Sequence, residues 1–353
     1  MHRRSLNATV DGHRQFEISD IHLWSVVRFR ADAPGNVEHA GYWTARIRGH
    51  PVGRTLSQVD VFLSGVFKNN AGERRYKLFR PGNLPPAGQR TLIVVLHGCT
   101  QDADDIARGT RFNEAASRDG FVVLYPEQPV TANPLKCWNW YIPEQIGRDQ
   151  GEASIIAELT AKIIKDEGIA PARVFLTGVS AGGAMAANLV ADYPELYSAV
   201  AIHSGLPAFA ASSQAEALGV MAKGPQNPDA LGERAFATMG ARARVVPVLL
   251  LQGVTDHLIS ILNLRASARQ WVVTNAKAAG TEVSGAVDVH PADQRLSGER
   301  FTLRDGTLIV ESWRIDGVGH AWSGGAPDAT YTDPKGPDAT ALILDFFGRY
   351  HPR

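Results

Sequence analysis

Continuous apolar runs alternate with helical patterns along most of this chain. The runs lack regular polar alternation, which is typical of strands buried on both faces in a parallel sheet. They lie at 91–98, 121–126, 174–179, 197–205, 245–253 and 307–315. Helical periodicity predicts helices near 103–118, 151–166, 181–191, 262–277 and 339–350. The pattern therefore predicts a doubly wound α/β fold with a mostly parallel sheet and helices on both faces.

Three other regions have weaker patterns. Residues 59–67 and 74–82 predict a β-hairpin. Residues 206–243 have no strand signal, so we expect a partly helical excursion over the sheet edge. Residues 1–56 show little periodicity. We therefore expect an N-terminal extension of unknown role, followed by one α/β domain at 57–353.

Composition and charge exclude several function classes. The 353 residues are 44% hydrophobic, and 36 Lys and Arg balance 36 Asp and Glu, so no overall field favours nucleic acid or an anionic membrane surface. No window approaches the roughly 20 apolar residues of a membrane-spanning helix, and the first thirty residues lack the apolar region of a signal peptide. Two cysteines exclude a disulfide-rich scaffold and a four-cysteine zinc site but permit one bridge.

Gly178 and Gly182 flank Ser180 in a G-x-S-x-G pattern between a predicted strand and a predicted helix. A sharp strand-to-helix turn strains the serine backbone, and its flanking positions must lack side chains so that strand and helix can approach. Such a turn places the hydroxyl above the carboxyl edge of the sheet, with the helix N-terminus directed at any oxyanion formed there. Ser180 is therefore the candidate nucleophile. A glycine-rich turn with an incidental serine is the alternative.

A serine hydroxyl needs a base to take its proton and a carboxylate to orient that base. In this fold the order along the chain is serine, acid, histidine. His320 lies in a glycine-rich loop after the last predicted strand, and Asp256 follows the run at 245–253, so both belong at the carboxyl edge. Asp316 is a rival acid, and Asp256 could instead be a helix N-cap. Three other histidines downstream of Ser180 fit the role of base less well: His257, His290 and His351.

An oxyanion hole requires two backbone donors. The first is the N–H of Ala181, immediately after the nucleophile. The second is expected from the loop after the first central strand, where Cys99 supplies the N–H and Gly98 allows close approach. We expect His97 to brace this loop by hydrogen bonding.

Six ordered motifs together resemble the polyhydroxybutyrate depolymerase family of esterases, within the α/β-hydrolase superfamily. They are LHGCTQ at 96–101, CWNW at 137–140, GVSAGG at 178–183, HSGLP at 203–207, GHAWSGG at 319–325 and GPDATALILDFF at 336–347. The likeness extends from about residue 73 to the end. The resemblance implies a triad of Ser180, Asp256 and His320, an oxyanion hole at Cys99 and Ala181, and hydrolysis of short 3-hydroxyacyl esters.

The resemblance also suggests a role for the two cysteines. We hypothesise a disulfide from Cys99 to Cys137 that would join the oxyanion loop to the CWNW loop, with two separate buried thiols as the alternative. A bridge implies maturation in an oxidising compartment, so an extracellular or periplasmic location is expected, with the cytoplasm as the alternative.

Three tryptophans, Trp138, Trp140 and Trp322, could form apolar walls for an acyl chain, although core packing is the alternative. No cluster has metal-ligand spacing, and no glycine pattern marks a nucleotide site, so neither metal nor organic cofactor is expected. The interpretation is a serine esterase whose partner is an ester substrate. The rivals are a feruloyl or acetyl xylan esterase, a catalytically inactive binding protein of the same fold, and a peptidase.

Overall fold

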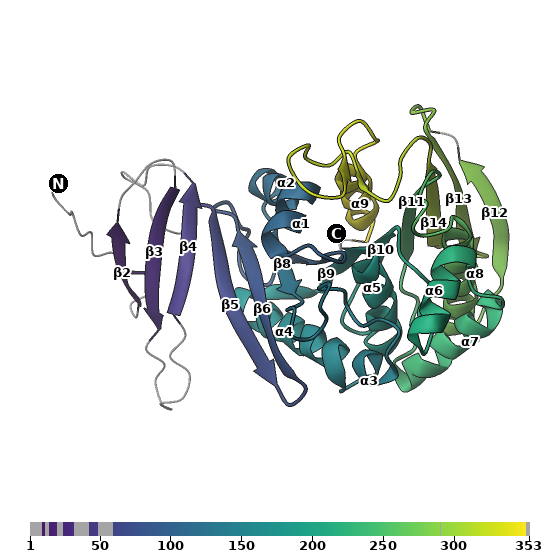
Figure 1. Cartoon of the computed structure of the whole chain (residues 1–353), viewed down its shortest axis with the longest axis horizontal. Coiled ribbons are helices and arrows are strands. Elements are labelled where there is room, and N and C mark those ends of the chain that lie inside the picture. The colour runs from purple at the N-terminus through teal and green to yellow at the C-terminus, as the bar shows by residue number, and fades with distance from the viewer. Residues whose placement is uncertain are drawn as a thin grey trace.

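A large mixed β-sheet organises the structure (Figure 1). The computed structural model describes strands at 9–10, 14–19, 24–31 and 42–48, and then residues 59–289 and 291–350. His290 and His351, both set aside as candidate bases, lie outside the described residues. Most of the predicted extension at 1–56 also lies outside them, so the division at residue 56 stays a prediction.

Six parallel strands form the centre of the sheet. In spatial order they are β8 (Val122–Glu127), β7 (Arg90–Leu96), β9 (Ile169–Val179), β10 (Ala199–His203), β11 (Val248–Gly253) and β14 (Leu308–Ile315). Each corresponds to one of the apolar runs, which confirms the predicted α/β class. Since these strands are parallel, their carboxyl ends lie along one edge.

Antiparallel strands extend this block on both sides. The predicted hairpin, β5 (Val61–Asn69) and β6 (Gly72–Arg80), pairs with β8. Beyond it, in spatial order, lie β4 (Tyr42–Arg48), β3 (Trp24–Ala31), β2 (Arg14–Ser19) and β1 (Thr9–Val10). On the other side, β13 (Leu296–Leu303) and β12 (Val283–Val289) follow β14. The apolar pattern did not predict this second hairpin, because most side chains of β12 are exposed.

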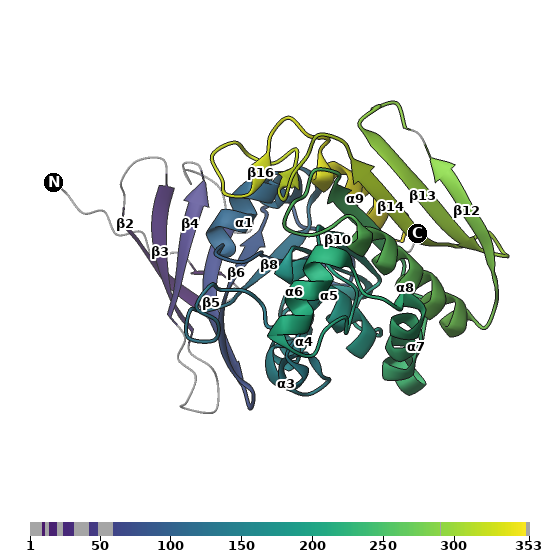
Figure 2. The same ribbon diagram turned by 45° about the vertical axis from the view of Figure 1, so that its right-hand side comes forward.

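Helices lie on both faces of the sheet (Figure 1 and Figure 2). A hydrophobic core lies on each face. Alternate residues of β7 point into different cores, Leu92 and Val94 into one and Ile93 and Val95 into the other. The first core contains residues of α4 (Gly151–Glu167), α5 (Ala181–Asp192) and α8 (Leu262–Ala279), together with the short α3 (Pro143–Ile146). The second contains residues of α1 (Ala103–Thr110), α2 (Phe112–Asp119) and α9 (Ala339–Gly348).

The structure adds detail to two regions that were predicted to be helical. The helix expected near 103–118 is two helices, because Arg111 adopts a left-handed conformation (φ 60°) and its N–H ends α1 on the carbonyl of Arg108. The excursion at 206–243 contains α6 (Gln214–Lys223), α7 (Pro228–Met239) and a 3₁₀ turn (Gly240–Arg242), as its missing strand signal indicated. Within the described part of the chain, no helix combines the length and apolar character needed to cross a bilayer.

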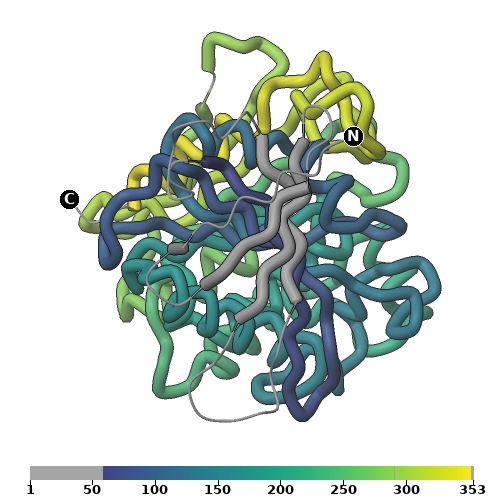
Figure 3. Tube along the Cα trace, turned by 90° about the vertical axis from the view of Figure 1, so that its left-hand side faces the viewer, coloured from purple at the N-terminus to yellow at the C-terminus, as the bar shows by residue number. Residues whose placement is uncertain are grey.

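Long loops after β14 gather at one rim of the molecule in every view (Figure 1, Figure 2 and Figure 3). They carry two short paired strands, β15 (Trp322–Ser323) and β16 (Thr332–Asp333). The N–H of Ala326 donates to the carbonyl of Gly109 at 3.0 Å, so these loops are attached to α1.

Asp192, the last residue of α5, is a buried carboxyl group with only 3% of its surface exposed. Its Oδ2 has no hydrogen-bond partner among the described residues. Burial raises its pKa to about 7, against the opposing effects of nearby Arg148, Arg234 and Arg242. The folded protein therefore binds this proton more tightly than the unfolded chain, in which an aspartate has a pKa of about 3.9. Ionisation of Asp192 thus lowers the free energy of unfolding as the pH rises from about 4 to about 7.

We expect Asp192→Asn to raise the free energy of unfolding by about 1–3 kcal/mol at a pH of about 8, because asparagine stays neutral. The gain should shrink as the pH falls through 7 and vanish near pH 4, where the native carboxyl group is already protonated. Denaturant unfolding at several pH values measures this difference. Asp328→Asn, at an exposed carboxylate, is the control. A gain from Asp192→Asn that is independent of pH would contradict the assignment.

Candidate active site

The turn from β9 into α5 holds Ser180 in a strained backbone conformation, with φ 57° and ψ −123°. The Ser180 N–H donates to the carbonyl of His203 at 3.0 Å, and its own carbonyl accepts from the N–H of Ala184 at 3.0 Å. A positive φ is unusual for a residue with a side chain and is maintained only where the surroundings enforce it. The turn therefore holds the serine hydroxyl at the start of a helix, above the end of a central strand.

The flanking glycines permit this turn because the backbone around them is too close for a side chain. A Cβ at Gly182 would lie 2.3 Å from the carbonyl oxygen of Leu96 and 2.5 Å from that of His97. A Cβ at Gly178 would lie 2.4 Å from the carbonyl oxygen of Gly182. The predicted reason for both glycines, close approach of strand and helix, agrees with these distances.

The structure brings Ser180, His320 and Asp256 into one hydrogen-bonded chain. Nε2 of His320 lies 3.0 Å from Oγ of Ser180, and Nδ1 of the same ring lies 2.8 Å from Oδ2 of Asp256. These residues follow β9, β14 and β11, whose carboxyl ends share one edge of the sheet. The arrangement has the geometry of a nucleophile, a base and an orienting acid.

Asp256 is placed to remain a carboxylate. Its Oδ1 accepts the N–H groups of Leu258 at 3.0 Å and Ile259 at 2.8 Å. Burial acts to raise its pKa, but the hydrogen bond and charge of His320, together with these two N–H groups, outweigh burial and hold the pKa below its usual range. An ionised Oδ2 accepts only, so Nδ1 of His320 carries the hydrogen and Nε2 is free to accept from the serine.

The alternative acid and base considered from the sequence, Asp316 and His257, are not part of this hydrogen-bonded chain. The side chain of Asp316 is exposed, and its backbone N–H donates to the carbonyl of Arg295. His257 is exposed beside the acid. Nothing in their described contacts joins either side chain to Ser180.

His203 connects two parts of the site, which sequence reasoning did not anticipate. Its carbonyl accepts the Ser180 N–H, its Nε2 accepts the N–H of Ser323 at 3.4 Å, and its ring stacks on Trp322 with 5.1 Å between centroids. Burial and the neighbouring His320 lower the pKa of His203 to about 3, so the ring is neutral at neutral pH. The HSGLP motif was the available signal, but its contacts depend on tertiary structure.

Two backbone N–H groups lie around the serine, those of Cys99 and Ala181. In the described part of the chain, neither the N–H of Cys99 nor that of Ala181 donates a hydrogen bond. The first follows Gly98, where a Cβ would lie 3.5 Å from the Cβ of Ser180. The N–H of Gly98 itself is held by Oε1 of Gln101 at 3.0 Å. Both N–H groups that were predicted as oxyanion donors are therefore free among the described residues and lie close to Ser180.

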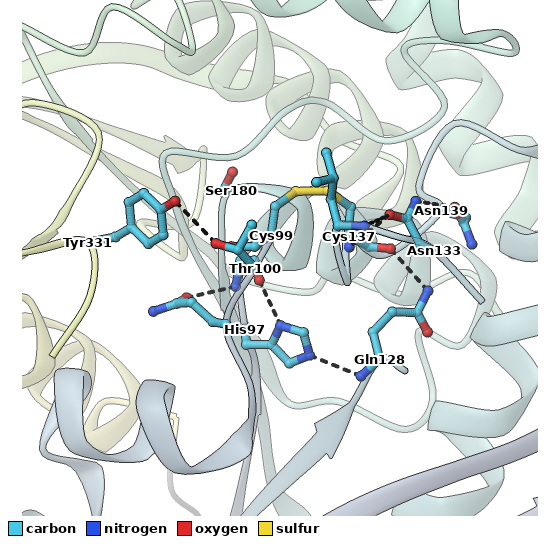
Figure 4. The surroundings of a disulfide bond; sticks show 12 residues. His97, Cys99, Thr100, Gln128, Asn133, Cys137, Asn139, Ser180 and Tyr331 are labelled. Carbon is cyan, nitrogen blue, oxygen red and sulfur yellow. Dashed lines mark hydrogen bonds between the residues drawn. A yellow bond between two sulfur atoms is a disulfide. The ribbon is translucent and has the colours of Figure 1, made fainter. Parts of the chain in front are cut away.

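A disulfide joins Cys99 to Cys137, as hypothesised (Figure 4). It connects the loop after β7 to the loop that contains CWNW. The N–H of Thr100 also donates to the carbonyl of Leu135 at 2.6 Å. These two links hold the oxyanion loop against its neighbour.

The predicted substrate role of the three tryptophans is corrected by their burial. The exposed fractions of Trp138, Trp140 and Trp322 are 0%, 5% and 2%, too little to form a wall for substrate. Each ring packs instead against another aromatic group, the rings of His97, Tyr141 and His203 respectively. They support the loops of the site from within the core.

Tyr331 is an exposed aromatic residue beside the oxyanion loop that sequence reasoning missed. Half of its surface is exposed, its backbone has a positive φ of 50°, and its hydroxyl accepts from Oγ1 of Thr100 at 3.1 Å (Figure 4). The preceding Thr330 donates its N–H to Asp105 at 3.2 Å. Tyr331 thus presents an exposed aromatic ring beside the loop that contains Thr100. No local pattern distinguishes it from any other loop tyrosine.

Among the described residues, no group of three or more His, Cys, Asp or Glu side chains could hold a metal ion.

The family model described as "Esterase PHB depolymerase" matches residues 75–291, which include the serine and the acid. Poly(3-hydroxyalkanoate) depolymerase C of Paucimonas lemoignei is 29% identical over 256 residues, or 72% of this chain and 60% of that protein. Acetylxylan esterase A of Talaromyces purpureogenus is 29% identical over 178 residues, or 49% of this chain and 45% of that protein.

Among solved structures, the acetyl xylan esterase from Aspergillus awamori superposes with a TM-score of 0.62 at 21% identity. The match covers 78% of this chain and 94% of that structure. This likeness concerns the fold. The chain spans less than two thirds of the length of the two curated relatives.

Proposed function

This chain belongs to the esterase PHB depolymerase family of the α/β-hydrolase superfamily, and we propose that it is a serine esterase that hydrolyses short-chain 3-hydroxyacyl esters. The observation that carries the proposal is the hydrogen-bonded chain from Asp256 through His320 to Ser180. The two free N–H groups beside the serine complete the set of groups that acyl transfer requires.

The first half of the reaction acylates the serine. Oγ of Ser180 bonds to the ester carbonyl carbon while its proton passes to Nε2 of His320. The carbonyl oxygen becomes an oxyanion that the N–H groups of Cys99 and Ala181 stabilise. When the tetrahedral intermediate collapses, the ester C–O bond breaks and the alcohol leaves with the proton from His320.

The second half uses water in place of the serine. His320 takes a proton from the water, whose oxygen bonds to the acyl carbon and forms a second oxyanion in the same position. Collapse breaks the bond to Oγ, and the proton returns to Ser180 as the acid is released. Asp256 remains ionised throughout and stabilises the imidazolium that forms in each half.

An esterase for plant cell-wall polysaccharides is the second candidate. Acetylxylan esterase A, as its name states, is a relative of this chain at the same identity as the depolymerase, although over a shorter span. Both candidates would use the same three catalytic residues. They would differ only in the ester substrate that the site binds.

A substrate panel separates the candidates. We expect the protein to hydrolyse p-nitrophenyl acetate and butyrate, and to release 3-hydroxybutyrate from its oligomers at least about tenfold faster, per enzyme, than acetate from acetylated xylan or ferulate from its methyl ester. Faster deacetylation of xylan would favour the second candidate. If the protein hydrolyses no ester and a fluorophosphonate probe does not label it, the result would favour a binding protein with an inactive site.

The disulfide supports a location for this activity. Stable disulfides persist in oxidising environments, and the bridge from Cys99 to Cys137 adjoins the proposed oxyanion donor. We therefore extend the proposal to an extracellular or periplasmic enzyme. Thiol titration of denatured protein from its native source would oppose this location if it yielded two free thiols.

A further inference from the structure

Strand β12 forms one edge of the sheet and has a partner strand on one side only. Among the described residues it pairs with β13, and it is the last strand in the spatial order (Figure 1 and Figure 2). Along the outer side of an edge strand, backbone N–H and C=O groups face outward without strand partners. Residues 284–288 of β12 are all exposed. The outer side of β12 is therefore available for pairing with a further strand.

The sequence of β12 lacks the features that usually prevent edge strands from pairing. Proteins protect such edges with lysine, proline or very short strands. The seven residues of β12, VSGAVDV, include no lysine, no proline and one charged residue, Asp288. The side chain of Val287 on this strand is apolar, and the residue is 62% exposed. An edge with these properties is a template for another strand.

An irregularity limits regular pairing to the second half of β12. The register with β13 shifts between Val283 and Ala286, and Gly285 in that interval has φ 106°. From Ala286 to Val289 the pairing with β13 is regular. A bulge bends a strand and disrupts its hydrogen-bonding pattern locally. A further strand therefore fits best against the segment centred on Val287.

This segment is complementary to itself. If two copies pair antiparallel about a twofold axis at Val287, the two Val287 side chains lie opposite each other. Asp288 of each copy then lies opposite Ala286 of the other copy, so no like charges are directly opposed. The pairing also covers an exposed apolar side chain in each copy. The same surface serves both partners, as a closed twofold dimer requires.

A groove adjoins this edge and adds apolar surface to it. Its volume is about 530 Å³. It lies between α8 and the start of β12, and its apolar lining comes from Val272, Val273, Ala276 and Val283. An isolated two-stranded pair is only marginally stable in water, so a stable dimer needs apolar contact as well. Because the groove adjoins β12, two copies that pair through this strand bring both grooves to one interface.

We propose that this chain forms a homodimer in which two β12 strands pair antiparallel and join the two sheets into one. The inference does not depend on the proposed function, because it uses none of the catalytic residues. The triad follows β9, β11 and β14, and β13 separates β14 from β12. We therefore expect the monomer and the dimer to have the same kcat.

Charge substitution at the twofold axis tests the pairing. Sedimentation velocity of the wild type at micromolar concentrations should show a species of twice the chain mass. Val287→Lys and Val287→Glu each place like charges opposite each other, and each should raise the dimer dissociation constant by at least about 100-fold. An equimolar mixture of the two variants places lysine opposite glutamate and should restore a dimer. Each variant should keep the melting temperature of a monomer and the wild-type kcat for p-nitrophenyl butyrate, because the residue is exposed.

Val66→Lys is the matched control. Val66 is 56% exposed on β5, which has partner strands on both sides, so this variant should remain dimeric. A monomeric wild type would overturn the inference. Dimers that persist in both Val287 variants would also overturn it, because the interface would then lie elsewhere. A mixture of the two variants that stays monomeric would show that opposed charge at the axis was not the cause, with the same consequence.

Discussion

Ser180→Ala is expected to lower kcat for p-nitrophenyl butyrate by between about 10⁴- and 10⁶-fold while leaving the protein folded. Alanine removes only the hydroxyl, so the backbone of the turn and its hydrogen bonds to His203 and Ala184 are retained. The loss is large because no acyl-enzyme can form without Oγ. The remaining N–H donors could still polarise a bound ester. This effect sets the lowest rate expected for the Ser180→Ala variant.

Hydrolysis rates and labelling by a fluorophosphonate probe measure this effect independently. Ser267→Ala is the matched control, because Ser267 is another buried serine, on α8. The control should keep both activity and labelling. If Ser180→Ala retained more than about one hundredth of the wild-type kcat, Ser180 would not be the nucleophile.

Asp256→Asn is expected to lower kcat roughly 10⁴-fold at neutral pH. The amide has nearly the same shape, but its NH₂ group can face Nδ1 of His320 as a donor. The ring would then carry its hydrogen on Nε2 and could not accept the Ser180 proton. An amide also stabilises the imidazolium less well than a carboxylate does. KM should change little, because Asp256 does not touch the substrate in the proposed mechanism.

Asp316→Asn tests the rival acid under the same conditions. Asp316 is exposed in the turn after β14, so its variant should retain wild-type kcat and melting temperature. Steady-state kinetics of both variants distinguish the two assignments. Loss of activity in Asp316→Asn together with retention in Asp256→Asn would require a different loop conformation from the one described.

The local parts of the site could be predicted from sequence because their physical requirements are local. The turn at Ser180 needs small residues at fixed spacing between a strand and a helix, and that spacing is visible in five consecutive residues. The central strands were equally predictable, because burial on both faces leaves a continuous apolar run. The hairpin of β12 and β13 was missed because an exposed edge strand lacks such a run.

The exposure of the tryptophans, in contrast, could not be predicted from the sequence. Composition and proximity in sequence suggested that Trp322, two residues from His320, would face the substrate. The fold instead turns this ring inward against His203, a residue that precedes it by more than one hundred positions. Exposure of an aromatic side chain depends on what the surrounding elements leave uncovered, so Tyr331 could be identified only from the fold.

Sequence pattern alone thus established the α/β class, the strained serine turn and a short list of bases and acids, since each depends on residues close together in the chain. The choice among those candidates required the tertiary structure. Ser180 and His320 are 140 positions apart and His320 and Asp256 are 64 positions apart, yet all three meet within 3.0 Å contacts. Parallel pairing of β9, β10, β11 and β14 brings their carboxyl ends to one edge, and this pairing is a property of the whole sheet.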